Sequence, residues 1–276
     1  MSNQHVDDHY GYGKLLAAIR AGLQRLGKTP QTATIDDLAP ADEFHIGGRQ
    51  ASLEFIDQLK LERGNHTLDV GCGLGGTARF IASHYGCRVT GIDLTTEFVK
   101  TGRELCDWVG LADRVVLHQG DALAMPFAEA SFDAATMLHV GMNIPDKADL
   151  FNQVAHVLKR GSIFGIYDIM KMSDENLDYP LPWASDLTVN SLGTMEQYSQ
   201  ALTSAGFEIL AYRDRRAFAM EFFDEARRKA AQREGPPPLG VHIAMGGDAP
   251  TKIKNMVDSL VAGSTAPMEI ITRKES

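Results

Sequence analysis

The sequence predicts an α/β fold built around a mostly parallel sheet. From about residue 48 onward, short apolar segments alternate with amphipathic stretches of roughly 10–15 residues, which is typical of repeated strand–helix–strand units. The chain has 276 residues, of which 44% are hydrophobic, enough to fill one or two cores. Seven segments read as strands, and in chain order they are HTLDV, RVTGID, RVVLHQ, FDAATMLHV, SIFGIYDIM, FEILAYRD and PMEIITR.

Amphipathic stretches between and beyond these strands predict the helices. An N-terminal helix is expected over 13–26, whereas the two prolines of 27–42 make that segment a predicted loop. The remaining helices are expected over 48–61, 75–86, 96–110, 146–161, 195–206, 222–235 and 249–263.

Composition excludes several classes of function. The net charge of −9 argues against nucleic acid as a partner, because phosphate backbones need a basic surface. The three cysteines lack metal-ligand or disulfide spacing, so we expect free thiols and no metal site. No apolar run reaches the ~18 residues of a membrane span, and the start MSNQHVDDHY lacks the apolar region of a signal peptide. We therefore expect a cytoplasmic monomer or homodimer that acts on a small molecule.

The stretch LDVGCGLGG follows the first of these strands and is the sharpest local motif. Its glycines Gly71, Gly73 and Gly76 spell G-x-G-x-x-G, which allows close approach of a ligand and favours a dinucleotide such as NAD. Asp69 argues against that ligand, because a carboxylate repels a pyrophosphate and attracts a cation. S-adenosylmethionine carries a sulfonium and an α-ammonium and no phosphate. The motif therefore predicts an S-adenosylmethionine site, with an NAD-dependent oxidoreductase as the alternative.

Two more carboxylates end the following strands. Asp93 lies about twenty residues after the first glycine, the spacing of a carboxylate that binds ribose hydroxyls. Leu94 could cover an adenine face, and Asp121 could accept the adenine amino group. Because ligands bind at the carboxyl ends of strands in open α/β sheets, these residues are expected to converge. Each residue alone could equally be a helix cap or a turn residue.

A family resemblance rests on the motifs LDVGCGLGG, VTGIDLT, GDALAMPF and AHVLKRGSIFGIYDI. Together they resemble class I S-adenosylmethionine-dependent methyltransferases over about residues 45–170. The segments DEFHIGGRQAS, HVGMNIPDK and YPLPWASD narrow the likeness to the sarcosine/dimethylglycine and phosphoethanolamine N-methyltransferase group. The resemblance departs at Arg160-Gly161-Ser162, where the family usually has Pro-Gly-Gly. It implies a Rossmann-like seven-stranded sheet whose last strand is antiparallel.

The resemblance also implies a set of cofactor-binding residues. The glycine loop would line the methionine moiety, the second strand end the ribose and adenine, and the third strand end the adenine. His139, at the end of the fourth strand, would face the sulfonium. The implied residues are Asp69, Gly71, Cys72, Gly73, Gly75, Asp93, Leu94, Asp121, Ala122 and His139.

The expected reaction is methyl transfer to a small polar acceptor, with an amine nitrogen favoured and oxygen or sulfur left open. An uncharged amine needs little help from a base once it is positioned. A hydroxyl needs a base, and His139, His45 or Tyr12 is the candidate. Both histidines have simpler interpretations, His139 as a satisfied core residue and His45 as a cap of the next helix.

Aromatic residues near the expected site could bind an alkylammonium group through their ring faces. For Trp183, ordinary packing within a lid is the alternative. The candidate substrate residues are Tyr12, Met142, Asn143, Tyr167 and Trp183.

Segments outside the alternating pattern suggest the domain organisation. We expect a helical N-terminal arm over 1–47 and a methyltransferase domain over 48–276. Lid elements are expected at about 171–200 and 215–264, because an acceptor must be shielded from water before transfer.

Overall fold

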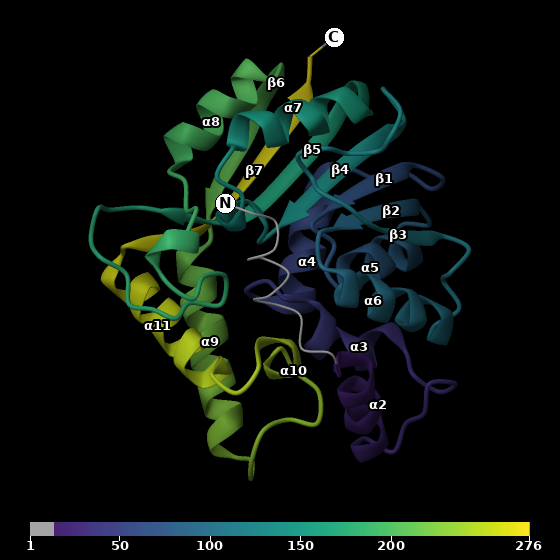
Figure 1. Ribbon diagram of the computed structural model, residues 1–276, viewed down its shortest axis with the longest axis vertical. Helices are drawn as coiled ribbons and strands as arrows, with labels where there is room; N and C mark the ends of the chain where they lie inside the picture. Colours follow the sequence, from purple (N-terminus) through teal and green to yellow (C-terminus); the bar gives the residue numbers. More distant parts are fainter. Residues whose placement is uncertain (1–13, 276) are drawn as a thin grey trace.

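A computed structural model describes residues 14–275 and contains one seven-stranded sheet in the order β3-β2-β1-β4-β5-β7-β6 (Figure 1). Strands β1 to β5 pair in parallel, and β7 is antiparallel to both of its neighbours. The predicted α/β class, the seven strands and the antiparallel last strand are confirmed. The strands are β1 (His66–Val70), β2 (Arg88–Asp93), β3 (Val115–Gln119), β4 (Phe132–Leu138), β5 (Leu158–Lys171), β6 (Phe207–Asp214) and β7 (Thr265–Lys274).

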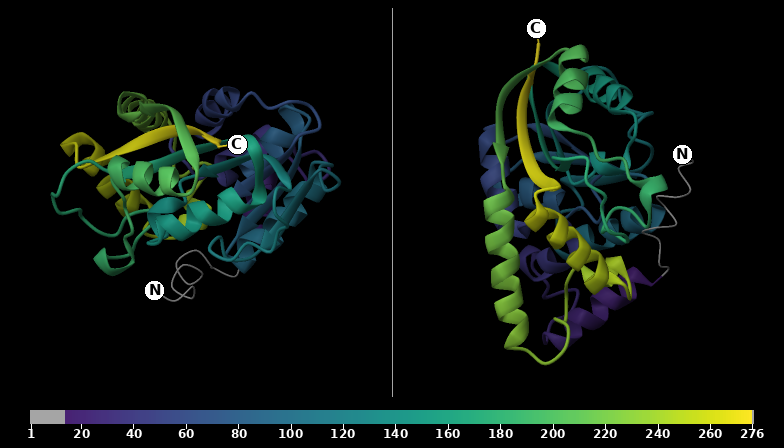
Figure 2. Two further views of the ribbon diagram at one scale, coloured as in Figure 1. Left: turned by 90° about the horizontal axis from the view of Figure 1, so that it is seen from above. Right: turned by 90° about the vertical axis from the view of Figure 1, so that its left-hand side faces the viewer.

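Helices cover both faces of the sheet (Figures 1 and 2). One face packs against α4 (Gly48–Ile56), α5 (Gly76–His84) and α6 (Thr96–Trp108), and the other against α7 (Lys147–Val157) and α8 (Met195–Ser204). The strands are apolar on both sides, as a sheet covered on both faces requires. In β5, for example, Phe164 and Ile166 join the α7–α8 core, whereas Tyr167 joins the α4–α6 core.

The remaining elements lie beyond the carboxyl ends of the parallel strands (Figure 1). They are α2 (Leu15–Arg25), α3 (Ile35–Asp42), α9 (Arg216–Ala231), α10 (His242–Met245), α11 (Ala249–Ala262) and the 3-10 turns η2 (Gly141–Asn143) and η3 (Leu187–Val189). The turn η1 (Asp57–Leu59) is not among them, because it follows α4 and its Leu59 joins the α4–α6 core. Helices α2 and α3 pack with α10 around Leu38, Leu74 and Leu239, and the segment 177–192 packs with α9 and α11 around Trp183 and Met256. Their placement is compatible with the expected lid, which stays a prediction together with the division at residue 47. The cluster around Trp183 and Met256 is called the lid core below.

The prediction of a loop over 27–42 is wrong, because helix α3 occupies its second half. Thr34 and Asp37 form a reciprocal capping box, in which the Asp37 N–H donates to Thr34 Oγ1 (3.2 Å) and the Thr34 N–H donates to Asp37 Oδ2 (2.8 Å). That cap starts the helix, and Pro40 removes only one backbone donor within it.

Several helix boundaries also differ from the expected ones, and the expected helix over 48–61 ends at Ile56, where η1 follows it. Helix α7 ends at Val157, and β5 begins directly at Leu158, so the expected helix over 146–161 is too long. Helix α9 begins at Arg216, six residues before the expected start at 222. No helix within residues 14–275 has the length and apolarity to span a membrane.

Candidate active site

Three glycines shape the loop after β1. Gly71, Gly73 and Gly75 have φ values of 67°, 53° and 78°, in the left-handed region that other residues enter only with strain. A Cβ on Gly71 would lie 2.3 Å from the side chain of Val140. The loop therefore presents bare backbone at the strand ends, and Gly75 is the N-cap of helix α5.

Asp69 lies near the carboxyl end of β1 with its carboxylate buried. Its Oδ1 accepts a hydrogen bond from Thr136 Oγ1 (3.0 Å), whereas Oδ2 has no partner among the described residues. Burial raises the pKa of Asp69 to about 7, against the lowering effect of the Thr136 hydrogen bond. A buried polar oxygen is unfavourable unless a donor reaches it, so Oδ2 fits the ammonium of a bound ligand.

Asp93, at the end of β2, organises the loop itself. Its Oδ2 accepts the N–H of Gly73 (2.8 Å), and its Oδ1 accepts the N–H of Thr95 at the start of α6 (2.8 Å). The helix-cap interpretation is therefore part of its role, and the expected ribose contact stays a prediction. Leu94 is half-buried beside it, and the thiol of Cys72, whose pKa burial raises, is a neutral packing group.

Asp121 and Ala122 lie half-buried in the turn after β3. Asp121 Oδ1 accepts the N–H of Leu123 (2.9 Å), which fixes the turn. Because β3 is parallel to β2, Asp121 and Asp93 lie at the same edge of the sheet. Their predicted contacts with adenine and ribose are compatible with this placement.

The N-terminus of α5 carries a carboxylate that the sequence analysis missed. Asp42 forms a buried ion pair with Arg79 of α5, and its Oδ1 would lie 2.6 Å from a Cβ on Gly76. A helix N-terminus is the place where a pyrophosphate would bind, and because Arg79 neutralises Asp42, the Asp69 carboxylate is the group that would repel one. This charge argues against the NAD alternative.

His139 follows β4 and holds an unusual backbone conformation. Its φ is 55°, and its N–H donates to Tyr167 O (2.7 Å). The imidazole Nε2 is buried and has no partner among the described residues. Burial, together with nearby His45, lowers the pKa of His139 well below 6.5, so the ring is neutral. His139 is therefore not a satisfied core histidine, and its strained backbone is typical of functional positions.

His45 lies beside His139 in the segment that leads into α4. Their ring centroids are 6.1 Å apart, and the Tyr167 ring is also 6.1 Å from His45. His45 Nε2 lies 3.1 Å from Gly48 O and 3.0 Å from Ser52 Oγ, so the ring does contact the start of α4 as its simpler interpretation expected. Burial lowers the pKa of His45 to about 4.

The predicted aromatic cage for an ammonium group receives little support from the geometry. Tyr167 is buried, and its hydroxyl donates to Ile46 O (3.0 Å). Trp183 is also buried, and its Nε1 donates to Asn190 Oδ1 (3.1 Å) within the lid core. Tyr12 lies outside the described residues. The expected role of these residues in substrate binding stays a prediction.

Met142 and Asn143 lie in η2, directly after His139. Met142 is buried in the lid core, and its carbonyl accepts the N–H of Ser191 (2.9 Å). Asn143 Nδ2 donates to Val140 O (3.3 Å). The turn thus links the end of β4 to the lid.

A buried network that the sequence analysis missed holds this link. Lys147 Nζ donates to Ser191 O (2.9 Å) and to Ile144 O, and Tyr198 OH donates to Asp168 Oδ2 (2.6 Å). Burial lowers the pKa of Lys147 to about 8 and raises that of Asp168 to about 6. The opposite charges partly offset both shifts, because each favours the ionised form of the other group. No spacing in the sequence pointed to this cluster, because Asp168 lies within β5 and Tyr198 within α8.

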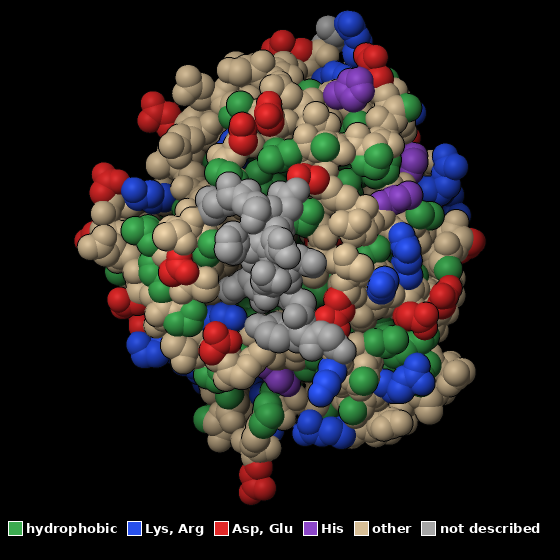
Figure 3. Space-filling model, in the orientation of Figure 1, with side chains coloured by type: hydrophobic (Ala, Val, Ile, Leu, Met, Phe, Trp, Pro, Cys, Tyr) green, Lys and Arg blue, Asp and Glu red, His purple; other side chains and the backbone are tan. Residues whose placement is uncertain are grey.

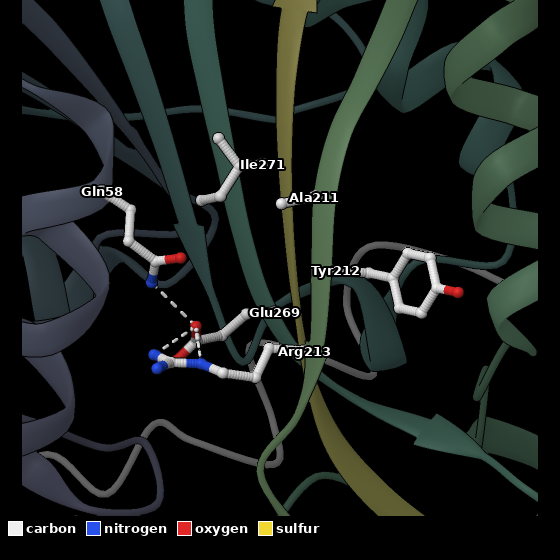
Figure 4. A pocket seen from close by; sticks show the side chains of 6 residues that line it. All are labelled: Gln58, Ala211, Tyr212, Arg213, Glu269 and Ile271. Atoms are coloured by element: carbon white, nitrogen blue, oxygen red, sulfur yellow. Dashed lines mark hydrogen bonds and ion pairs between the residues drawn. The ribbon is translucent and has the colours of Figure 1, made fainter.

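A separate pocket lies away from these residues, between η1 and strands β6 and β7 (Figure 4). Its Glu269 carboxylate accepts hydrogen bonds from Gln58 Nε2 (2.8 Å) and from Arg213 Nη2 (2.7 Å), whereas the Tyr212 ring points away from them. Because its charges neutralise each other, this pocket offers little to a charged ligand.

Acidic and basic side chains are mixed among the described residues of the face shown in Figure 3.

The fold, the glycine loop and the strand-end carboxylates resemble those of class I S-adenosylmethionine-dependent methyltransferases. Residues 68–166 match the family described as "Methyltransferase domain". The predicted cofactor, S-adenosylmethionine, and the predicted enzyme class are confirmed.

Curated relatives carry different acceptor classes in their names. Methyltransferase GfsG of Streptomyces halstedii is 27% identical over 216 residues, covering 77% of this chain and 76% of the relative. An O-methyltransferase of Pyrenophora dematioidea is 28% identical over 76% of this chain and 74% of the relative. A sterol 24-C-methyltransferase of Eremothecium gossypii is 34% identical over 55% of this chain, which spans 42% of that protein.

Solved structures share the fold at lower identity. A Galdieria sulphuraria protein assigned as a sarcosine dimethylglycine methyltransferase has a TM-score of 0.67 at 21% identity, covering 82% of this chain and 86% of its own. Phosphoethanolamine N-methyltransferase 2 of Haemonchus contortus, solved with S-adenosyl-L-methionine, has a TM-score of 0.69 at 20% identity and covers 93% of this chain and 60% of its own. The [4+2]-cyclase SpnF has a TM-score of 0.69 at 22% identity and covers 100% of this chain and 97% of its own. The fold alone therefore does not determine the acceptor.

Proposed function

We propose that this protein methylates a hydroxyl group of a small molecule, with His139 as the base. The observation that carries the proposal is the buried Nε2 of His139, which has no partner among the described residues. Because its pKa lies well below 6.5, the ring is neutral and able to accept a proton at physiological pH. S-adenosylmethionine, when bound, supplies the electrophilic methyl group.

The protein's own residues have separable roles in this proposal. Asp69 Oδ2 would hold the ammonium of the cofactor, and Asp93 would hold its ribose while fixing the loop at Gly73. His139 would hold the acceptor hydroxyl and take its proton. The lid around Trp183 would exclude water, which strengthens these polar contacts.

The role of His139 as a base favours a hydroxyl over an amine as the methyl acceptor. A neutral amine attacks without a base, so an imidazole with an unpartnered nitrogen would have no task there. The O-methyltransferase among the relatives supports the hydroxyl. Methylation of an amine nitrogen is the second candidate, supported by the names of two structural neighbours.

Matched pairs of alcohols and amines test the proposal. Release of S-adenosylhomocysteine should occur with the alcohols and fall by about 10²–10⁴-fold in His139→Ala, while binding of S-adenosylhomocysteine is retained. With an alcohol and saturating S-adenosylmethionine, the rate should change little between about pH 6.5 and 8, because the pKa of His139 lies below that range. Turnover of the amines alone, with a rate that rises with pH and is unchanged in His139→Ala, would contradict the proposal.

A further inference from the structure

Three buried side chains form a connected group at the start of α4. Ser52 Oγ donates to Glu43 Oε2 (3.0 Å) and lies 3.0 Å from His45 Nε2. Their exposed fractions are 3% for Glu43, 7% for His45 and 0% for Ser52. Water therefore does not compete for these contacts, and the three side chains and their protein neighbours decide which group donates each hydrogen bond and which accepts it.

The donors and acceptors in this group determine which nitrogen of His45 carries the proton. A serine hydroxyl has one hydrogen, and here it is directed to the Glu43 carboxylate. Burial raises the pKa of Glu43 to about 7, and the charge of Arg49 favours the ionised form, which can only accept. Ser52 Oγ can then only accept from His45 Nε2. The Gly48 carbonyl, 3.1 Å from the same nitrogen, can also only accept. Both neighbours require the hydrogen on Nε2, which leaves Nδ1 as the proton acceptor of the ring.

Glu43 is itself held in place from the other side. Arg49 Nε lies 2.6 Å from Glu43 Oε1, and the Arg49 guanidinium lies over the Phe80 ring at 4.5 Å. The Glu43 carboxylate thus has one oxygen for Arg49 and the other for Ser52. This arrangement gives Ser52 a fixed direction for its hydrogen.

We propose that Glu43, acting through Ser52, holds His45 in the Nε2–H tautomer and so orients the His45–His139 pair for removal of the acceptor proton. The inference rests on the proposed function, in which His139 is the base. Glu43 and Ser52 are positioning residues, since neither reaches the reacting atoms. The 6.1 Å separation of the two imidazoles means that a change in the His45 ring changes the surroundings of the base.

Nitrogen-15 spectra of histidine-labelled protein test the tautomer directly. The full-length protein should give one His45 ring with a protonated Nε2 and an unprotonated Nδ1, and loss of these signals in His45→Gln assigns them. A proton on Nδ1 would overturn the proposal. This measurement needs no acceptor and no turnover.

Two variants test the positioning role. Ser52→Ala and Glu43→Gln should alter the His45 nitrogen shifts and lower kcat roughly 10- to 100-fold, as expected for a misplaced catalytic pair. The KM for the acceptor and the Kd of S-adenosylhomocysteine should change by less than about twofold. Ser199→Ala is the matched control, because its hydroxyl donates to Met195 O within α8. That control should leave kcat and the His45 signals unchanged.

The outcomes separate this inference from the proposed function. If both variants fold, as thermal melting shows, and keep the wild-type kcat and His45 shifts, the positioning role is wrong. If one variant unfolds, the other variant and the wild-type spectrum still decide. If no alcohol is methylated, the proposed function fails, whereas a proton on His45 Nδ1 in the wild-type spectrum would separately overturn the tautomer assignment.

Discussion

Thr136 binds only one oxygen of the Asp69 carboxylate, at 3.0 Å, and the other oxygen is buried without a donor among the described residues. Burial raises the pKa of Asp69 from 3.8 to about 7. An ammonium ligand binds the ionised form, so it should lower this pKa and release a proton on binding. Affinity for S-adenosylhomocysteine should therefore fall as pH drops below about 7, approaching tenfold per unit, and level off above it.

Calorimetry in buffers of different ionisation enthalpy measures both the affinity and the proton release. Asp69→Asn should bind weakly at all pH values and show no step near pH 7. Because the pKa of Asp69 is raised in the folded protein, ionisation of Asp69 lowers the stability of the wild type as pH rises to about 7. Asp69→Asn lacks this charge and should therefore unfold less readily than wild type at pH 8. Equal wild-type affinities at pH 5.5 and 8 would show that Asp69 does not meet the ammonium.

Asp93→Ala should weaken cofactor binding by about 1–3 kcal/mol, the usual cost of leaving hydrogen-bonding groups without partners. The structure assigns part of this loss to the loop, since the N–H groups of Gly73 and Thr95 lose their acceptor. Asp113→Ala, at an exposed position between α6 and β3, is the control for charge removal. A Kd equal to that of wild type would mean that Asp93 holds only the backbone.

Arg79→Met should lower the free energy of unfolding by about 3–5 kcal/mol, because it strands the buried Asp42 carboxylate. The exposed pair Lys254–Asp258 provides the comparison, and Asp258→Ala should cost below about 1 kcal/mol. Urea titration measures both. Similar losses for the two variants would show that the Asp42–Arg79 pair does not anchor α3 to the glycine-loop helix.

Lys147→Met should raise the KM for the acceptor while the Kd of S-adenosylhomocysteine stays constant. Lys147 ties Ser191 of the lid to the turn after His139, and its loss should loosen the acceptor side alone. Lys100→Met, an exposed change on α6, should alter neither constant. An unchanged KM in Lys147→Met would show that the contact between Lys147 and Ser191 does not support acceptor binding.

The sheet was predictable because the strand–helix alternation and the glycine loop are local patterns. The capping box of Thr34 and Asp37 was visible in the sequence but was outweighed by the prolines of the same segment. The direct junction of α7 and β5 at Leu158 could not be read, because its residues suit either element.

The cofactor side of the site was better predicted than the acceptor side. Asp69, Asp93 and Asp121 end neighbouring strands, so topology alone brings them together. The partners of Glu43 and Arg79 depend on how separate segments fold over the loop, which no spacing reveals. Trp183 was expected in a cage and lies in the lid core, because its large apolar surface is better satisfied there.

Transfer of a carbon-13 methyl group from labelled S-adenosylmethionine tests directly whether this protein methylates a hydroxyl with His139 as the base. Wild-type protein and His139→Ala are incubated with the same pool of small alcohols and amines, and the chemical shift of the transferred carbon identifies the atom to which it is bound. We expect a methoxy signal with wild-type protein that is lost in His139→Ala, although both bind the cofactor. An N-methyl signal of equal intensity in the two proteins would contradict it.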